Sequence, residues 1–334
     1  SITLHQLDIN YDEMYGRTLP KRILGYWKKQ RLFKKRLNEC LCNIRPDITI
    51  SLLRRDINFI NKVKDGSIKI GEIHFNKSDY RAFNDNHLPM FLQRIVKEHW
   101  RRQLIRQLRQ LKRFIVLSHE DAAQWTELNN VSVIYNPLPF YPGVSSDNSQ
   151  KQVIAVGRYV PQKGFDRLIP AWKIVSEQHP DWTLRIYGDG MREKLQQQID
   201  SLGISSNCVL EHSVPNIVDK YCESSIFVLS SRFEGFGMVI IEAMACGVPP
   251  VSFTCPCGPR DIITDGKNGL LVENGDIEGL AGKICYLIEN EKVRKEMGKQ
   301  ARINVERFKI EHVAQEWREL FETLTKQPYS DQLS

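Results

Sequence analysis

Short apolar runs alternate with longer amphipathic stretches along most of the chain, and glycine, proline or aspartate bounds most of the runs. In the second half these runs are rich in β-branched side chains, which predicts buried strands. The strands are expected at residues 152–156, 183–187, 208–211, 226–229, 249–253 and 270–272. Helical periodicity lies between them, at residues 164–178, 191–202, 217–224, 238–246, 276–289 and 291–307. This alternation predicts a parallel, doubly wound sheet.

The first half alternates in the same way but has longer helical stretches. Strands are predicted at residues 47–53, 68–75, 114–118 and 131–135, and long amphipathic helices at 20–43 and 88–112. The chain opens with a strand-like segment at residues 2–5 and has no glycine before Gly16. A nucleotide-type domain normally opens with a strand and a glycine-rich turn. We therefore expect a first Rossmann-like domain that lacks its N-terminal βα unit.

Residues 141–150 separate the two patterns, because they are rich in Pro, Gly, Ser and Asn and poor in periodic apolar positions. This composition predicts a linker between a first domain of residues 1–140 and a second domain of residues 151–310, followed by a final helical segment at 311–334.

Charge distinguishes the two halves. Residues 1–140 hold 25 basic and 14 acidic side chains, whereas residues 141–334 hold 22 and 26. A basic first domain indicates an anionic partner, which is a membrane surface, a phosphate-bearing acceptor or nucleic acid. No window approaches the roughly 20 apolar residues of a membrane-spanning helix, so we expect a cytoplasmic protein.

The eight cysteines form no paired CxxC set, which is typical of a protein from a reducing compartment. Cys255 and Cys257 flank Pro256 and offer two metal ligands at most, so a tight turn is the preferred interpretation over a metal site.

Candidate chemistry is densest at residues 230–249, directly after a predicted strand. A Gly-Phe-Gly turn at residues 235–237 leads into a helix whose first amides would suit phosphate oxygens. Glu234 lies on the loop, and Glu242 lies about a turn and a half into the helix. Both carboxylates would accept hydrogen bonds from sugar hydroxyls. The alternative is an ordinary strand–turn–helix unit with two solvated glutamates.

Two further loops follow strands of the same predicted sheet. Arg158 and Lys163 lie on the loop after residues 152–156, where two cations beside glycines would clamp a diphosphate. Gly188 and Val214 lie on the loops after the next two strands, and backbone there would line a nucleotide base pocket at the carboxyl edge of the sheet. The alternatives are surface cations at a domain entrance and turns without a ligand.

The arginine–lysine loop, the Gly-Asp-Gly turn and the Glu-Gly-Phe-Gly…Glu-Ala-Met-Ala-Cys-Gly-Val-Pro run together resemble the family 4 (group 1) glycosyltransferases. The resemblance covers about residues 152–325. It implies the GT-B fold, with two Rossmann-like domains facing a cleft that holds the donor and a last helix that crosses back to the first domain. It also implies transfer with retention of anomeric configuration.

The resemblance assigns roles within the donor site. Arg158 and Lys163 would contact the donor diphosphate, and Glu242 would bind the ribose. Glu234 would contact the transferred sugar. The segment after it would bind phosphate through backbone amides, which makes donor-binding candidates of Phe236, Gly237 and Met238.

The catalytic candidates are Glu234, Arg158, Lys163 and, from the first domain, His74. His74 follows a predicted strand and would hydrogen-bond the donor sugar or orient the acceptor, unless it merely caps the strand. No clear nucleophile is present in the first domain, which favours a front-side route with the leaving phosphate as base. No Asp-x-Asp pair occurs, so neither a divalent metal nor another cofactor is expected.

Two basic amphipathic stretches, at residues 21–37 and 99–113, suit an anionic membrane surface. Alternatively, their apolar stripes pack on the sheet and the charges are solvated. If they contact lipid, the acceptor is expected to be lipid-linked, such as a polyprenyl-diphosphate glycan, and the enzyme to lie on the inner face of the cytoplasmic membrane.

The sequence therefore predicts a retaining, metal-independent transferase that moves a hexosyl or N-acetylhexosaminyl unit from a nucleotide-diphosphate sugar, with UDP favoured, to a glycan or lipid-linked acceptor. The alternatives are a sugar-nucleotide epimerase or phosphorylase of the same fold and a non-catalytic subunit that binds sugar nucleotides. A nucleic-acid-binding module is disfavoured, because no helix-turn-helix or zinc pattern occurs.

Overall fold

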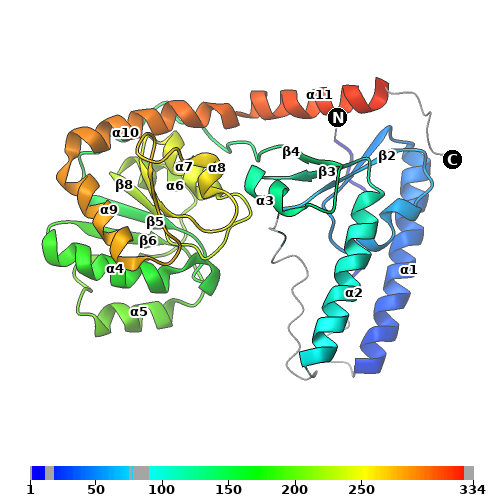
Figure 1. The fold of residues 1–334 in the computed structure, drawn as a ribbon, viewed down its shortest axis with the longest axis horizontal. Coiled ribbons are helices and arrows are strands. Elements are labelled where there is room, and N and C mark those ends of the chain that lie inside the picture. Colours follow the sequence, from blue (N-terminus) through cyan, green and yellow to red (C-terminus); the bar gives the residue numbers. More distant parts are fainter. Residues whose placement is uncertain (1, 12–18, 75–76, 78–89, 327–334) are drawn as a thin grey trace. The chain divides into compact units, whose positions relative to one another are not determined.

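The computed structural model describes residues 2–11, 19–74, 77 and 90–326 (Figure 1). The chain divides into two compact units. The first comprises residues 1–116 and 125–133 together with the chain from residue 318 onward, and the second comprises residues 117–124 and 134–317. Each unit is built on its own parallel sheet.

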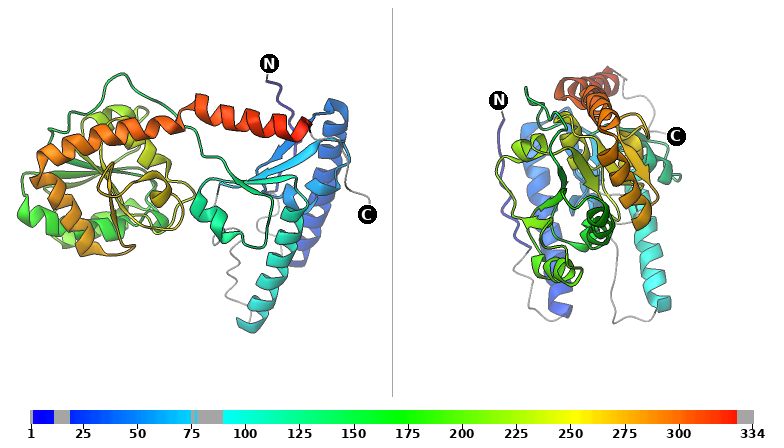
Figure 2. Two further views of the ribbon diagram at one scale, coloured as in Figure 1. Left: turned by 45° about the horizontal axis from the view of Figure 1, so that its top comes forward. Right: turned by 90° about the vertical axis from the view of Figure 1, so that its left-hand side faces the viewer.

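The first unit has a four-stranded sheet in the order β1-β2-β3-β4. Its strands are β1 (Ile48–Ser51), β2 (Ile68–Glu72), β3 (Arg113–Val116) and β4 (Val131–Val133). Two long helices precede strands of this sheet: α1 (Leu19–Ile44) leads into β1, and α2 (Met90–Arg109) leads towards β3. Both helices extend past the sheet (Figure 2). Two 3₁₀ turns, η2 (Asp56–Asn58) and η3 (Ile60–Lys62), follow β1, and α1 packs on this region through a ring contact between Phe33 and Phe59 at 5.1 Å.

The second unit has a six-stranded parallel sheet in the order β10-β9-β8-β5-β6-β7. Its strands are β5 (Gln152–Val156), β6 (Thr183–Tyr187), β7 (Cys208–Glu211), β8 (Ile226–Leu229), β9 (Pro250–Phe253) and β10 (Leu270–Val272). From β5 the chain adds β6 and β7 on one side, and from β8 it adds β9 and β10 on the other. The order therefore reverses between β5 and β8, and ligands of open α/β sheets bind at the carboxyl ends of strands at such a switch point.

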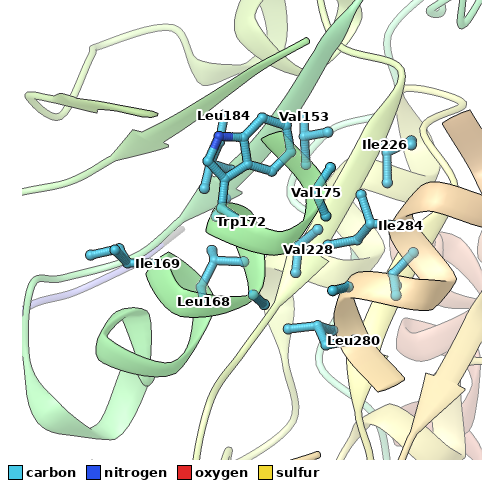
Figure 3. Close-up of a cluster of buried hydrophobic side chains, with 14 of the residues drawn as sticks. Val153, Leu168, Ile169, Trp172, Val175, Leu184, Ile226, Val228, Leu280 and Ile284 are labelled. Carbon is cyan, nitrogen blue, oxygen red and sulfur yellow. The ribbon is translucent and has the colours of Figure 1, made fainter. Parts of the chain in front are cut away.

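Both faces of this sheet are covered, because alternate residues of each strand point to opposite sides. Val153 and Ala155 join a cluster with Trp172 of α4, and Figure 3 shows Val153 and Trp172 within it. Ile154 joins the cluster on the other face. The first cluster involves α4 (Phe165–Gln178), α5 (Arg192–Ser201) and α9 (Ile277–Glu289). The second involves α6 (Ile217–Cys222), α7 (Met238–Ala245), α8 (Pro259–Ile262), α10 (Glu291–Asn304) and η5 (Val305–Phe308).

The predicted strands of the second unit agree with the structure to within one residue, and the helices to within a few residues. The short helices α3 (His119–Gln124) and α8, of six and four residues, were not predicted. The strand predicted at residues 2–5 is absent: residues 2–11 have no regular structure, and Ile2 and Leu4 are 94% and 92% exposed. No strand of either described sheet pairs with this segment, so burial of its apolar side chains does not stabilise a strand here.

Residues 141–150, predicted as a linker, have no helix or strand and lie on the second unit. The Ser146 hydroxyl donates to the Ser224 carbonyl at 2.6 Å, and the Asn148 amide donates to the Gly247 carbonyl at 3.0 Å. The compact units therefore divide between residues 133 and 134, upstream of the predicted linker. The last helix, α11 (Ile310–Lys326), begins in the second unit, and its residues from 318 onward group with the first.

All eight cysteines are free thiols. No helix among the described residues is both long enough and apolar enough to cross a membrane.

Candidate functional site

The loops that follow β5 and β8 meet at the switch point of the second sheet. The first loop ends in the turn η4 (Pro161–Lys163), and the second carries Glu234. The Lys163 ammonium lies 2.8 Å from Oε1 of Glu234, and the Ser231 hydroxyl donates to the same oxygen at 2.6 Å. Both partners of the ion pair are largely shielded, with side chains 15% and 8% exposed. Two residues singled out from separate sequence motifs thus form one contact.

A second set of bonds fastens these loops to each other. The Arg232 amide donates to the Gln162 carbonyl at 2.8 Å, and its guanidinium forms a fork with the two carboxylate oxygens of Asp166 at 2.7 and 2.6 Å. Gly164 lies between them with a left-handed backbone, at φ 66°, and a Cβ there would overlap the Ser230 carbonyl. Only glycine fits such a position without strain, so the close approach of the loops depends on it.

Glycines also bring the backbone close to Lys163 on the other side. A Cβ on Gly188, directly after β6, would overlap the Gly157 carbonyl, and a Cβ on Gly157 would press on the aliphatic stem of Lys163 at 3.2 Å. The aliphatic stem of Lys163 therefore packs directly over the Gly157 backbone, where no side chain intervenes. Glycine at position 188 therefore lets the backbone after β6 approach the Gly157 loop closely.

Glu242 lies in α7 and is held from the neighbouring helix α6. The hydroxyl of Tyr221 lies 3.2 Å from Oε2 of Glu242. Burial raises the pKa of Glu242, and the Tyr221 hydrogen bond and the Lys163 charge oppose this shift only in part. Lys163 therefore influences both glutamates of the motif, because it pairs with Glu234 and its charge favours the ionised form of Glu242.

The start of α7 supplies the predicted backbone donors. Gly237 caps the helix in a left-handed conformation at φ 97°, and its carbonyl accepts from the Ile240 amide at 2.9 Å. The amides of Met238 and Val239 are the first of the helix and have no partner within it. The Phe236 side chain is buried between the rings of Tyr135 and Phe308, so this residue offers a ligand only its backbone.

The other two predicted donor-binding residues on this edge, Arg158 and Val214, differ in their surroundings. Arg158 is exposed, and within the described part of the chain its side chain has no ion-pair partner. Val214 is partly buried and packs against the hydrophobic cluster that includes residues of α6 and α7. Ahead of it, the Asp189 carboxylate binds the His212 ring at 2.9 Å and Ser213, and hydrogen bonds from Ser213 and then His212 lower the pKa of Asp189. Asp189 thus fixes the loop that carries Val214.

His74 belongs to the first unit, directly beyond β2, whereas the other candidates belong to the second. Its side chain is half-exposed, and its Nε2 lies 3.3 Å from a Glu72 carboxylate oxygen. This contact fits either a strand-end histidine or one poised toward a ligand, so its catalytic role stays a prediction.

The two cysteines of the Cys-Pro-Cys segment are fully buried. Cys257 has a left-handed backbone at φ 63°, and burial raises its thiol pKa to about 12. The described residues contain no group of three or more His, Cys, Asp or Glu side chains placed to hold a metal ion. The Pro256 carbonyl accepts from the Glu234 amide at 3.1 Å, so this turn supports the Glu234 loop.

Three features were not predicted from the sequence: the Tyr221–Glu242 bond, the Arg232–Asp166 fork and the Asp189 cluster. Each joins residues far apart in the chain, and no motif marks it. What the edge offers chemically is two cations, helix amides and two carboxylates around one switch point, a set that suits a ligand with both phosphates and hydroxyls.

Known proteins match this chain over the same region. Residues 142–304 match the family described as Glycosyl transferases group 1. An uncharacterized glycosyltransferase of Haemophilus influenzae is 31% identical over 211 residues, which cover 62% of this chain and 60% of that protein. A poly(ribitol-phosphate) alpha-N-acetylglucosaminyltransferase of Staphylococcus aureus is 28% identical over 253 residues, covering 74% of this chain and 51% of that protein. The chain thus spans roughly half to three fifths of these relatives.

A solved structure extends the likeness to both units. A TarM mutant of S. aureus, in complex with fondaparinux, alpha-GlcNAc-glycerol and UDP, matches with a TM-score of 0.69 at 25% identity. The match covers 88% of this chain and 59% of that chain. The two parallel-sheet α/β domains are those of the GT-B fold, so the fold prediction is confirmed, and the family match confirms the resemblance drawn from the glutamate motif.

Proposed function

We propose, from the premise that residues 142–304 belong to the group 1 glycosyltransferases, that this chain transfers a hexosyl or N-acetylhexosaminyl unit from a nucleotide-diphosphate sugar. The acceptor is a glycan or lipid-linked glycan in the assembly of cell-surface polysaccharide or lipopolysaccharide. The observation that carries the proposal is the Lys163–Glu234 contact beside the first turn of α7. It joins a phosphate-binding cation to a carboxylate that can hold sugar hydroxyls.

In this proposal Lys163, Arg158 and the first amides of α7 hold the diphosphate, Glu242 the ribose and Glu234 the transferred sugar. The bond between the anomeric carbon and the diphosphate oxygen breaks, and its electron pair stays on the diphosphate. The acceptor oxygen bonds to the anomeric carbon on the same face, and its proton passes to the departing phosphate oxygen. The two cations stabilise the charge that develops there, so the proposed route is retaining and requires no metal.

UDP is the favoured nucleotide, since the matching TarM structure contains UDP. The basic first domain supports an anionic acceptor, which is either a phosphate-bearing polymer or a polyprenyl-diphosphate glycan. The S. aureus relative that acts on poly(ribitol-phosphate) supports the first of these.

Peripheral binding to the inner face of the cytoplasmic membrane belongs to the same proposal. Trp27 and Leu24 of α1 are 61% and 59% exposed, and the basic side chains Lys21, Lys28 and Arg31 nearby are exposed too. Exposed tryptophan among cations suits an anionic lipid surface. Co-sedimentation with vesicles of phosphatidylglycerol, but not of phosphatidylcholine, is expected, and Trp27→Ala should weaken it. Equal binding to both vesicle types would contradict recognition of an anionic surface, and binding to neither would leave α1 and α2 as solvated helices.

Incubation of the chain with UDP-sugars and with each acceptor tests the transferase function. The proposal expects a glycosylated acceptor and free UDP, with the anomeric configuration of the donor kept in the product, which NMR can read. Conversion of the UDP-sugar to its epimer without acceptor would indicate an epimerase, and phosphate-dependent cleavage a phosphorylase. UDP-sugar binding without turnover would indicate a non-catalytic subunit.

A further inference from the structure

Tyr221 is one of the most deeply enclosed polar side chains of the second unit. It lies near the end of α6, has no exposed surface, and packs its ring edge-on against Phe227 at 6.1 Å. Its hydroxyl lies 3.2 Å from Oε2 of Glu242. A buried hydroxyl without a partner is destabilising, so this bond restricts where the two side chains can lie.

The bond has a defined direction. Burial raises the pKa of the Tyr221 hydroxyl well above its usual value, and the Glu242 charge adds to this shift. The phenol therefore keeps its proton at every physiological pH and donates it to the carboxylate. Bonds from a donor to an ionised carboxylate are stronger than neutral ones.

The bond uses only one of the two carboxylate oxygens. Within the described residues, the other oxygen of Glu242 has no hydrogen-bond partner. The Lys163 charge is close enough to favour the ionised form of Glu242. The carboxylate thus has one oxygen anchored in the core and one available to a ligand beside the lysine of the donor site.

We propose that Tyr221 is a positioning residue for the donor: its hydroxyl fixes the Glu242 side chain so that the available oxygen accepts a hydrogen bond from a hydroxyl of the nucleotide ribose. This inference rests on the proposed function, and it adds a residue outside the recognised motifs. Tyr221 touches no ligand itself and acts only through Glu242.

The titratable groups around Glu242 give the proposal a pH signature. They are Tyr221 from α6, Lys163 from η4 and, at the end of its own helix, Cys246, which burial keeps as a neutral thiol by raising its pKa. Of these, Tyr221 and Lys163 stabilise the carboxylate against the effect of burial. Removal of the hydroxyl leaves Lys163 alone in that role, so Glu242 would be protonated at a higher pH.

The test is UDP affinity, measured by calorimetry on the full chain and on Tyr221→Phe between pH 5.5 and 8.5. The variant removes one oxygen atom and is expected to bind UDP about fivefold to tenfold more weakly at neutral pH. The deficit should grow as the pH falls and shrink as it rises. UDP itself titrates in this range, but the ratio of the two affinities at each pH cancels its contribution.

Tyr141→Phe is the matched control, because the Tyr141 hydroxyl also bonds a glutamate, Glu306, at 2.8 Å in the same unit. This control should bind UDP as the unaltered chain does. In a Glu242→Gln background, Tyr221→Phe should cause no further loss. Thermal unfolding of each variant shows that it folds.

The outcomes are separable. An equal affinity of Tyr221→Phe and the unaltered chain overturns the inference, as does a loss of the same size at every pH or in both backgrounds. If the unaltered chain binds no UDP and no UDP-sugar, the proposed function itself fails.

Discussion

The Lys163 ammonium and the Glu234 carboxylate are 2.8 Å apart, although 71 positions separate them in the sequence. They meet because β5 and β8 are neighbours in the sheet. The chain between these two strands forms β6 and β7, which lie on the far side of β5. Both side chains are largely buried, where the attraction of opposite charges is much stronger than in water. The contact holds a cation at the position where we propose that a diphosphate binds.

Replacing Lys163 with alanine should weaken UDP binding at least tenfold, a change of about 1.4 kcal/mol. It should also lower the free energy of unfolding by about 3 kcal/mol, because the Glu234 charge would stay buried without its cation. In Lys163→Ala/Glu234→Gln the stability should recover in part while the UDP affinity stays low. Calorimetry and chemical denaturation measure the two quantities.

The control for this prediction is Lys151→Ala. Lys151 precedes β5 at the opposite edge of the sheet and pairs with Asp181 on the surface. Its removal should leave UDP affinity unchanged, and a similar loss in both lysine variants would argue that only overall charge matters.

UDP affinity should fall as the pH decreases, because Glu242 must be ionised to accept a hydroxyl proton and burial raises its pKa. The folded pKa lies above the unfolded value, so this group's contribution to stability has the opposite sign: it is full below the unfolded pKa and is lost as the pH rises through the folded one. Glu242→Gln should remove the part of both dependences that this carboxylate causes and leave the titration of UDP itself, and Glu242→Ala should weaken binding at least tenfold. A Glu242→Gln profile identical to that of the unaltered chain would contradict this.

The Arg232–Asp166 fork should couple the two loops that carry Lys163 and Glu234. Arg232 and Asp166 are 31% and 46% exposed, so a double-mutant cycle with alanine should give a coupling of about 1 kcal/mol in stability. Either single variant should also reduce UDP affinity, while Arg232→Lys should keep part of it. Additive effects in the cycle would show that the fork does not fasten the loops.

Replacing His74 with alanine should lower the transfer rate about tenfold and leave UDP affinity unchanged, because His74 belongs to the first unit and the proposed nucleotide-binding residues belong to the second. Steady-state kinetics with a saturating donor measures the effect. An unaltered rate would return His74 to the role of a residue that caps β2 beside Glu72.

The sequence predicted the second unit well because its strands are continuous β-branched runs, buried on both faces, with glycine or proline at their ends. It predicted residues 2–5 poorly, since an apolar pattern of four residues does not reveal whether a neighbouring strand exists. Residues 75–76 and 78–89 include the end of a predicted strand and the start of a predicted helix, and both lie outside the described residues.

The sequence predicted the candidate residues that belong to motifs, but not the contacts that depend on tertiary packing. Arg158, Lys163 and Glu234 lie on loops that follow strands, and Glu242 lies in the helix after the Glu234 loop, which places all four near one edge before any contact is known. The bond from Tyr221 could not be foreseen, because it depends on the packing of α6 against α7 rather than on any local pattern. The same is true of the Arg232–Asp166 fork.

The most direct test of the donor site is thermal unfolding of the full chain in the presence of UDP, UDP-sugars and GDP-sugars. A bound ligand stabilises the folded state by mass action, by about 2.7 kcal/mol at a concentration one hundred times its Kd. We expect UDP and at least one UDP-sugar to raise the unfolding temperature of the unaltered chain and to lose this effect in Lys163→Ala. No shift with any nucleotide sugar, or an equal shift in the variant, would contradict a donor site at the junction of β5 and β8.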